Sequence, residues 1–112
     1  MLNKKHRLAK TKDVELVFAR GRSFFNPLVS VKFFRNDREK KRFTVVVSTK
    51  VSKKAVSRNR LKRILREFVR LRLDKFLPGD YAIVVRPAAA KTEEKVLLQE
   101  LEKLFKKGGL LE

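Results

Sequence analysis

Side chains able to carry out chemistry are scarce in this chain, and their types exclude most enzymatic sites. There is no cysteine and one histidine, His6, which excludes thiol nucleophiles, thiolate zinc sites and acid–base catalysis by paired histidines. The 12 acidic residues form no cluster outside the polar turn at 35–42 and the last predicted helix, whereas a two-metal site needs several converging carboxylates. We therefore expect no catalytic residue, no tightly bound metal and a function in binding.

Basic side chains dominate instead, and they are concentrated between Ser52 and Arg72. This stretch carries nine Lys and Arg side chains against one acid, Glu67. In a helix, at about 100° per residue, its apolar side chains share one face and most of its basic side chains lie opposite. The predicted apolar stripe consists of Leu61, Ile64, Leu65, Phe68 and Leu71.

The basic face predicts a polyanionic partner. Like charges recur at four-residue intervals at Arg58, Lys62, Arg66 and Arg70. Each such pair repels by roughly a few tenths of a kcal/mol, so the row weakens the isolated helix. A face selected only for solubility would mix both signs of charge. Asn59 is a poor helix former, but its amide offers donors and acceptors between two arginines, which suits phosphates and base edges.

The composition of the whole chain agrees with a nucleic-acid partner. The 112 residues include 30 Lys plus Arg and 12 Asp plus Glu, giving a formal net charge of +18. A chain of this length supports one hydrophobic core, for which nine phenylalanines are available, so 1–112 is expected to be a single domain. No apolar run approaches the roughly 20 residues of a membrane span, and no signal-peptide core follows the first residues. We therefore expect a cytoplasmic protein with no membrane partner.

The hydrophobic pattern predicts a small α+β domain around one sheet. In chain order it predicts a loosely packed basic arm (1–12), a short helix from residue 13 ended by Gly21, strands over 29–33 and 43–47, a helix over 58–72, a strand over 81–85 and a helix over 92–107. The strands 29–33 and 43–47 are expected to pair as an antiparallel hairpin or meander. Phe18 fits either the core or a surface that stacks on RNA bases. The phenylalanines expected in the core are Phe24, Phe25, Phe33, Phe43, Phe68 and Phe105.

The segment RNRLKRILRE (58–67) resembles the signature helix of the bacterial ribonuclease P protein subunit. The resemblance extends over nearly the whole chain, through the basic opening, Val17 and Phe18 before Gly21, and the late segment DYAIVVRP (80–87). It implies an α/β sandwich with a central mixed sheet of about four strands. The long basic helix would lie in a left-handed crossover, as in the second domain of a small-subunit ribosomal protein. An N-terminal and a C-terminal helix would flank the sheet.

The same resemblance implies a function. The protein would be the subunit of ribonuclease P, the ribonucleoprotein endonuclease that removes the 5′ leader from precursor tRNA. It would bind the catalytic RNA and the single-stranded leader as a monomer, one per RNA, broadening substrate use and lowering the magnesium requirement. The protein alone would not be catalytic. Magnesium would be held mainly by the RNA.

The resemblance also implies three groups of binding residues. The surface for the catalytic RNA would comprise Lys53, Lys54, Arg58, Asn59, Arg60, Lys62, Arg63, Arg66 and Arg70. The leader-binding cleft would comprise Val14, Phe18, Lys32, Ser48, Lys50, Arg58, Lys62 and Arg66. The basic arm would contribute Lys4, Lys5 and Arg7. Val14 and Lys32 depart from the family pattern, because aromatic residues are expected at both positions, and Lys32 would offer a phosphate contact in place of stacking.

Three alternatives remain open on the residues alone. A small basic ribosomal protein would bind ribosomal RNA and have no effect on tRNA 5′ maturation. A DNA-binding module would place 58–72 in a major groove, but it would require a dimer or a helix-turn-helix partner, and 44–57 is predicted as strand and loop. A membrane-surface helix is the third reading, and the folded-core pattern on both sides of 58–72 disfavours it.

Overall fold

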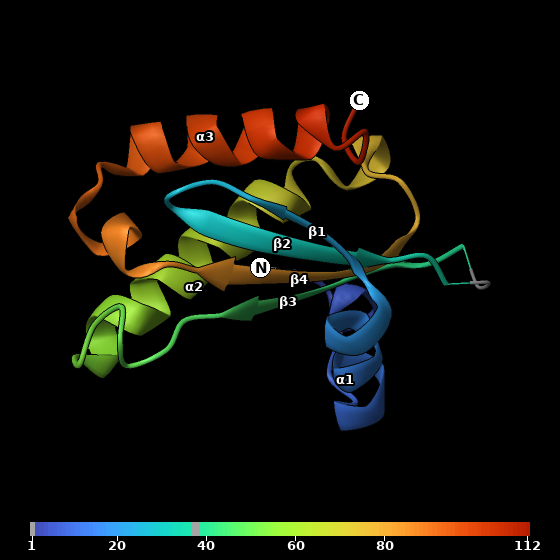
Figure 1. The fold of residues 1–112 in the computed structure, drawn as a ribbon, viewed down its shortest axis with the longest axis horizontal. Coiled ribbons are helices and arrows are strands. Elements are labelled where there is room, and N and C mark those ends of the chain that lie inside the picture. Colours follow the sequence, from blue (N-terminus) through green and yellow to red (C-terminus); the bar gives the residue numbers. More distant parts are fainter. Residues whose placement is uncertain (1, 37–38) are drawn as a thin grey trace.

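The computed structural model describes residues 2–36 and 39–112 and contains three α-helices around a four-stranded sheet. The elements in chain order are α1 (Thr11–Arg20), β1 (Arg22–Phe25), β2 (Val29–Phe34), β3 (Lys41–Val46), α2 (Ala55–Arg70), β4 (Gly79–Val85) and α3 (Glu94–Lys107), with short 3₁₀ turns at Lys4–His6, Leu73–Lys75 and Pro87–Lys91. Figure 1 shows α3 and α2 on one side of the sheet and α1 on the other. The expected mixed sheet and flanking helices are confirmed.

The strand order corrects one prediction. The sheet runs β1-β2-β4-β3, so the predicted hairpin between 29–33 and 43–47 is wrong, because β4 lies between these two strands. β4 pairs antiparallel with β2 and parallel with β3. Its segment Tyr81–Val85 is apolar throughout, and such a strand is stable only at the centre of a sheet, with neighbours on both edges. The hairpin partner of β2 is instead β1, a short strand that the sequence analysis did not separate from it.

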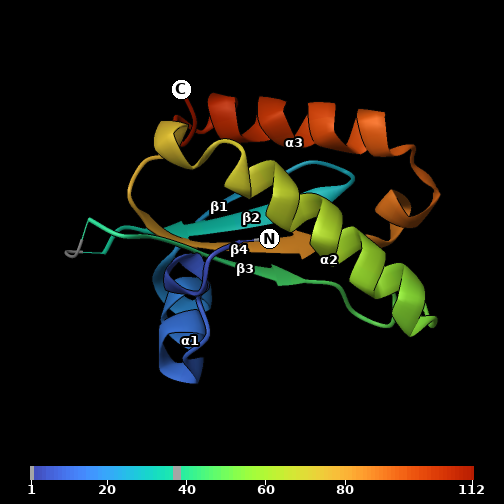
Figure 2. The same ribbon diagram turned by 180° about the vertical axis from the view of Figure 1, so that it is seen from behind.

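The connection from β3 through α2 to β4 is a left-handed crossover. In Figure 2, α2 lies in front of the sheet, β3 and β4 both point to the right, and β4 lies above β3. This is the reverse of the sense found in about 98% of parallel β–α–β connections. The expectation that came from the family resemblance is therefore confirmed.

The main core lies between the sheet and the helices α2 and α3. Alternate residues of β2, beginning at Val29, are buried on this side. Aromatic rings fill the centre: the Tyr81 ring stacks on Phe43 with centroids 4.6 Å apart, and Phe76 meets Phe105 edge-on at 5.0 Å. The Tyr81 hydroxyl donates a hydrogen bond to the carbonyl of Leu77, and burial raises the pKa of Tyr81 above its ordinary value.

The apolar stripe of α2 is turned slightly from its predicted position. Leu61, Leu65 and Phe68 are buried as expected, but Val69 is fully buried while Leu71 is 62% exposed. The helix ends at Arg70, so Leu71 is the capping residue beyond its last turn. The predicted inclusion of Leu71 in the core is wrong.

The N-terminal segment is packed, in contrast to the loose arm that was expected. Leu2 and Leu8 are 2% and 3% exposed. The Leu8 amide donates to the Phe43 carbonyl at 2.8 Å, and His6 Nδ1 lies 2.8 Å from the Lys41 carbonyl oxygen. Segment 2–8 therefore lies along the outer edge of β3, where two leucines anchor a stretch that the charge pattern alone assigned to solvent.

The predicted end of α1 at Gly21 is confirmed, and its reason is a close approach. Gly21 has φ −71°, so no left-handed conformation is required. A Cβ atom at this position would lie 2.3 Å from the Val17 carbonyl oxygen and 3.1 Å from the Phe33 carbonyl oxygen. Only glycine lets the chain pass this closely from α1 into the sheet.

Candidate nucleic-acid interface

One face of the sheet is largely uncovered, and it holds the predicted RNA contacts of α1 and β2. On β2 the side chains of Ser30, Lys32 and Phe34 point to this side, opposite the buried valines. Figure 1 looks onto this face, where α1 lies across its right-hand end and no helix of the described residues lies in front of the remainder. We call this surface the open sheet face.

Helix α1 packs on one end of the open sheet face. Val17 is fully buried against Ala82 of β4, and Val14 and Phe34 pack beside them with Leu8. This second small cluster explains why Phe34 interrupts the alternation of β2: its ring is apolar because α1 covers it. Val14 is consequently half-buried, which is a packing role.

An ion-pair cluster fixes α1 to the sheet. The Arg42 guanidinium lies 2.7 Å from an Asp80 carboxylate oxygen and 3.2 Å from an Asp13 carboxylate oxygen of α1. A second Asp80 oxygen accepts from Arg42 Nε at 2.8 Å and from Asn36 Nδ2 at 2.7 Å. Asp80 is 3% exposed, and its hydrogen bond raises the pKa of Arg42 further above its ordinary value. The sequence analysis missed this cluster, since its members are far apart along the chain.

Phe18 and Lys32 lie at the α1 end of the open sheet face in accessible positions. Phe18 is 38% exposed, so it lies at the surface and not in the core, and its stacking on RNA bases stays a prediction. Lys32 is half-buried, and its Nζ donates to the Ser23 hydroxyl at 2.8 Å. An exposed ring and a lysine on the same face of a sheet are suited to a base and a phosphate of single-stranded RNA.

The basic row of α2 flanks the exposed side of β3. Arg58, Lys62 and Arg66 recur every fourth residue and are half-buried. Arg58 Nη1 donates to the Ser52 carbonyl at 2.9 Å, which ties the helix to the loop before it. Arg66 lines a small cavity of about 150 Å³ together with Thr44 of β3. These side chains are therefore partly packed against the protein while the remainder of each is open to solvent.

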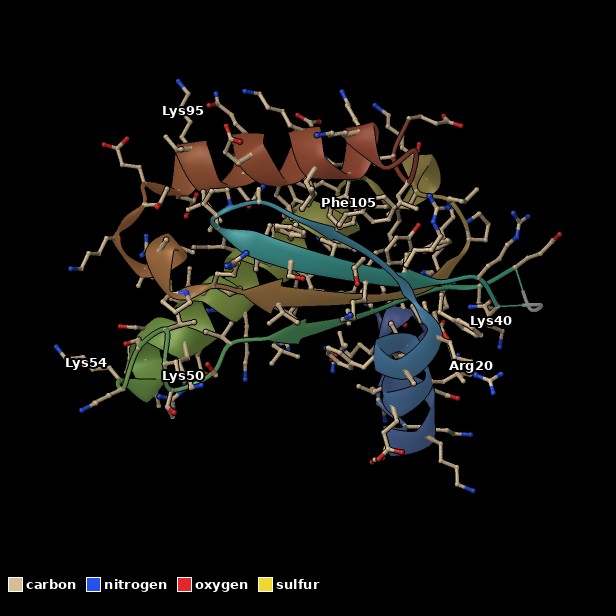
Figure 3. All side chains as sticks on the ribbon, in the orientation of Figure 1. Arg20, Lys40, Lys50, Lys54, Lys95 and Phe105 are labelled. Carbon is tan, nitrogen blue, oxygen red and sulfur yellow. The ribbon has the colours of Figure 1, made fainter. Side chains whose placement is uncertain are left out.

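The remaining predicted contacts lie farther from α1. Ser48, Lys50, Lys53 and Lys54 are exposed in the loop that precedes α2. Figure 3 places Lys50 and Lys54 at one end of the molecule and Arg20, at the end of α1, toward the other. The predicted leader cleft is thus divided into an α1 part, with Val14, Phe18 and Lys32, and an α2 part that runs along β3 to the loop.

The outer face of α2 is basic, but not all of its charge is free. Asn59, Arg60 and Arg63 are exposed, and Arg60 lies 4.0 Å from Glu94 of α3. Arg70 makes a two-pronged hydrogen bond with Glu67, which raises the pKa of Arg70 and lowers that of Glu67. Arg70 is therefore already partly neutralised within the helix.

Arg72 also has partners within the protein. Its guanidinium carbon lies 3.9 Å from the Phe68 ring centroid, and its Nε lies 3.5 Å from Glu102. In segment 2–8, Lys4, Lys5 and Arg7 are exposed at the surface, and Arg7 Nε also donates to the Leu2 carbonyl at 3.2 Å.

The described residues include no cluster of side chains arranged to hold a metal ion. Within 2–36 and 39–112, no three His, Cys, Asp or Glu side chains gather as a metal site. Asp13 of α1 and Asp80 of the central strand β4 are bridged by Arg42. No helix of the described residues is long and apolar enough to cross a membrane.

Comparison with known proteins decides the family. The family model described as Ribonuclease P matches residues 2–109. The chain belongs to the ribonuclease P protein family. The ribonuclease P protein component of Cyanothece sp. is 34% identical over 99% of this chain and 98% of its own length. That of Exiguobacterium sp. is 37% identical over 95% of this chain and 92% of its own length.

Solved ribonuclease P proteins share the fold. The Staphylococcus aureus protein superposes with a TM-score of 0.91 at 25% identity, covering 97% of this chain and 100% of that one. The Thermotoga maritima protein gives a TM-score of 0.81 at 29% identity, covering 90% and 96%. Membership of this family makes the chain part of an endoribonuclease holoenzyme of tRNA 5′ processing, in which its partner is ribonuclease P RNA. The family assignment decides against the three alternatives, a ribosomal protein, a DNA-binding module and a membrane-surface helix.

Proposed function

We propose that the protein holds the single-stranded 5′ leader of precursor tRNA on its open sheet face, and binds the RNA subunit through the outer face of α2. The observation that carries the proposal is that an accessible ring, Phe18, and Lys32 lie at one end of the open sheet face. The half-buried basic row of α2 lies along β3. Single-stranded RNA is commonly bound by aromatic rings that stack on bases within a positively charged groove.

The outer face of α2 suits a structured RNA partner. Arg60, Arg63 and Asn59 are exposed on a helix that is rigidly packed along Leu61, Leu65 and neighbouring core residues. Guanidinium groups form bidentate hydrogen bonds with phosphates, and a rigid helix positions them without further ordering cost. Contacts from Lys53 and Lys54 would extend this surface beyond the N-terminal end of α2.

Catalysis is proposed to reside in the RNA subunit, with magnesium bound mainly by RNA. The protein then contributes positive charge and position. A formal charge of +18 beside RNA phosphates reduces their mutual repulsion, and so reduces the magnesium concentration that the complex requires. We propose one protein monomer per RNA, acting in the cytoplasm, where the precursor tRNA is made.

Cleavage of precursor tRNA tests this function. The assay compares ribonuclease P RNA at low magnesium with and without the protein, on substrates with and without a 5′ leader. Stimulation should depend on the leader and should fall roughly tenfold in the Arg58→Ala and Lys62→Ala proteins, because each variant removes a phosphate contact. Lys95→Ala, on α3, removes an exposed charge on the other side of the sheet and should leave stimulation unchanged. Equal stimulation of both substrates would refute leader binding.

A further inference from the structure

The most exposed phenylalanine lies on the open sheet face, at the end away from α1. Phe25 is 69% exposed, against 38% for Phe18, which corrects its prediction as a core residue. It ends β1 and pairs with Ser30 of β2. Because paired residues point to the same side of a sheet, the Phe25 ring shares its face with Ser30, while Phe24 beside it turns toward the core.

Arg86 is held next to this ring. It follows β4, and its backbone amide donates to the Leu28 carbonyl at 2.9 Å. Its Nη1 donates to the Asn26 carbonyl at 3.3 Å, and its guanidinium carbon lies 5.9 Å from the Phe25 ring centroid. The β1–β2 turn and the end of β4 thus bring an aromatic ring and a cation together, with the ring accessible to solvent.

The surroundings favour an anionic, planar ligand. Two positions along β1 from Phe25, Ser23 pairs with Lys32, so the ring and the lysine lie on one face at neighbouring pleats. On this face the four strands carry one acidic residue, Asp80, and it is buried beneath α1 and paired with Arg42. An exposed apolar side chain alone is ordinary. A ring with an arginine beside it, on a face whose accessible charges are positive, matches a nucleotide.

The position of Phe25 also relates to the departure at Lys32. Where the resemblance leads one to expect an aromatic residue on β2, this chain has a lysine, which can meet a phosphate but cannot stack on a base. The neighbouring strand supplies a ring on the same face, about 7 Å farther along the strand direction. Phe25 can therefore supply the base stacking that an aromatic residue at position 32 would have supplied, and Lys32 can supply a phosphate contact.

We propose that Phe25, with Arg86, forms a base-stacking site for a nucleotide of single-stranded RNA, which extends the leader path across the open sheet face. The proposal rests on the proposed function, because it requires the leader to cross this face. Phe25 would contact the face of a base, and Arg86 the adjoining phosphate. Stacking of this kind is tolerant of sequence, so the site would respond to leader length more than to leader composition.

The test uses the holoenzyme assembled with variant proteins and measures the affinity for precursor tRNAs whose leaders are long, short or absent. Phe25→Ala should weaken binding of the long-leader substrate roughly 5- to 150-fold, the range expected for one lost stacked base. Binding of the short-leader and leaderless substrates should not change. Phe25→Trp, which keeps an aromatic ring, should bind the long-leader substrate as tightly as wild type. Phe25→Leu, which keeps an apolar side chain without a ring face, should bind it as weakly as Phe25→Ala.

Two controls separate this site from general effects. Val96→Ala removes an exposed apolar side chain on α3, at 41% exposure, and should leave every affinity unchanged. Thermal unfolding of the Phe25 variants should match that of the wild-type protein, since the ring is mostly exposed. Arg86→Ala should weaken long-leader binding less than Phe25→Ala and should lower its dependence on salt concentration.

The failure of this inference differs from the failure of the proposed function. If wild-type affinity rises with leader length and Phe25→Ala keeps that rise, the stacking site is refuted while leader binding stands. The same conclusion follows if Phe25→Leu binds as tightly as wild type, or if Phe25→Ala weakens all substrates equally. If wild-type affinity is independent of the leader, the proposed function itself is refuted, and the stacking site with it.

Discussion

The two faces of the sheet differ in how they are covered, although the same strands form both. Toward α2 and α3, the side chains of Val31, Tyr81 and Ile83 are fully buried. Toward α1, the alternate positions hold Ser30, Lys32 and other half-buried side chains. The alternation of β2 therefore places buried core residues on one face and, under the proposed function, the RNA contacts on the other, so substitutions on the two faces should affect different measurements.

The largest expected effect lies on the covered face. Phe105→Ala should reduce the free energy of unfolding by about 4 kcal/mol, because it removes a fully buried ring that contacts Phe76 and Tyr81. Urea denaturation would measure this loss. At a temperature where the variant is folded, its leader-dependent affinity should equal that of wild type. A selective loss of leader binding in the folded variant would contradict the division between the faces.

The second effect tests the attachment of α1. Arg42→Met should cost about 3 kcal/mol of unfolding free energy, because it leaves the Asp80 carboxylate buried without its cation. It should also weaken leader binding, since α1 carries Phe18. The control Asp13→Asn breaks the more exposed ion pair of the same cluster and should cost about 1 kcal/mol or less. Equal losses of unfolding free energy in the two variants would show that Arg42 does not stabilise the buried Asp80 carboxylate.

The third effect uses the buried Tyr81 hydroxyl as a pH probe of the covered face. Because its pKa is raised in the folded state, the unfolded state loses this proton first as pH rises above about 10. This group should therefore lower the unfolding free energy by about 1.4 kcal/mol per pH unit above that point. Unfolding measured between pH 9 and pH 11 in wild type and Tyr81→Phe isolates the contribution. Identical pH profiles would contradict it.

The smallest expected effect lies on the open face. Phe18→Ala should lower affinity for a long-leader precursor by about 1 kcal/mol, from lost stacking, and change the unfolding free energy by less than that. Both predictions are checked by measuring the affinity for the long-leader precursor and the urea denaturation curve on the same protein preparation. Val96→Ala is matched in exposure, at 41% against 38%, and should change neither. If Phe18→Ala lowers the unfolding free energy by more than it lowers the free energy of leader binding, Phe18 acts as a core residue.

Local patterns of the sequence were sufficient for the three helices and for strands β2, β3 and β4, but not for the short strand β1. The alternation at 29–33 and the spacing of Leu61, Leu65 and Phe68 depend on neighbours within one strand or helix, so they can be recognised in the sequence. The same reasoning failed for Phe25 and Leu71, whose exposure depends on where other elements end. It also failed for segment 2–8, because two leucines among many charges give no periodic signal.

The sequence alone was enough to predict a protein that binds a polyanion and lacks the side chains of common catalytic sites, because composition, the lone His6 and the 58–72 charge pattern need no tertiary information. Only the tertiary structure decided that β4 separates β2 from β3, that Arg42 joins Asp13 to Asp80, and that Phe25 shares a face with Lys32. The physical reason is the separation along the chain of the residues that each feature involves. Charge and periodicity act between residues near in the chain, whereas strand order and ion-pair partners depend on contacts between residues dozens of positions apart.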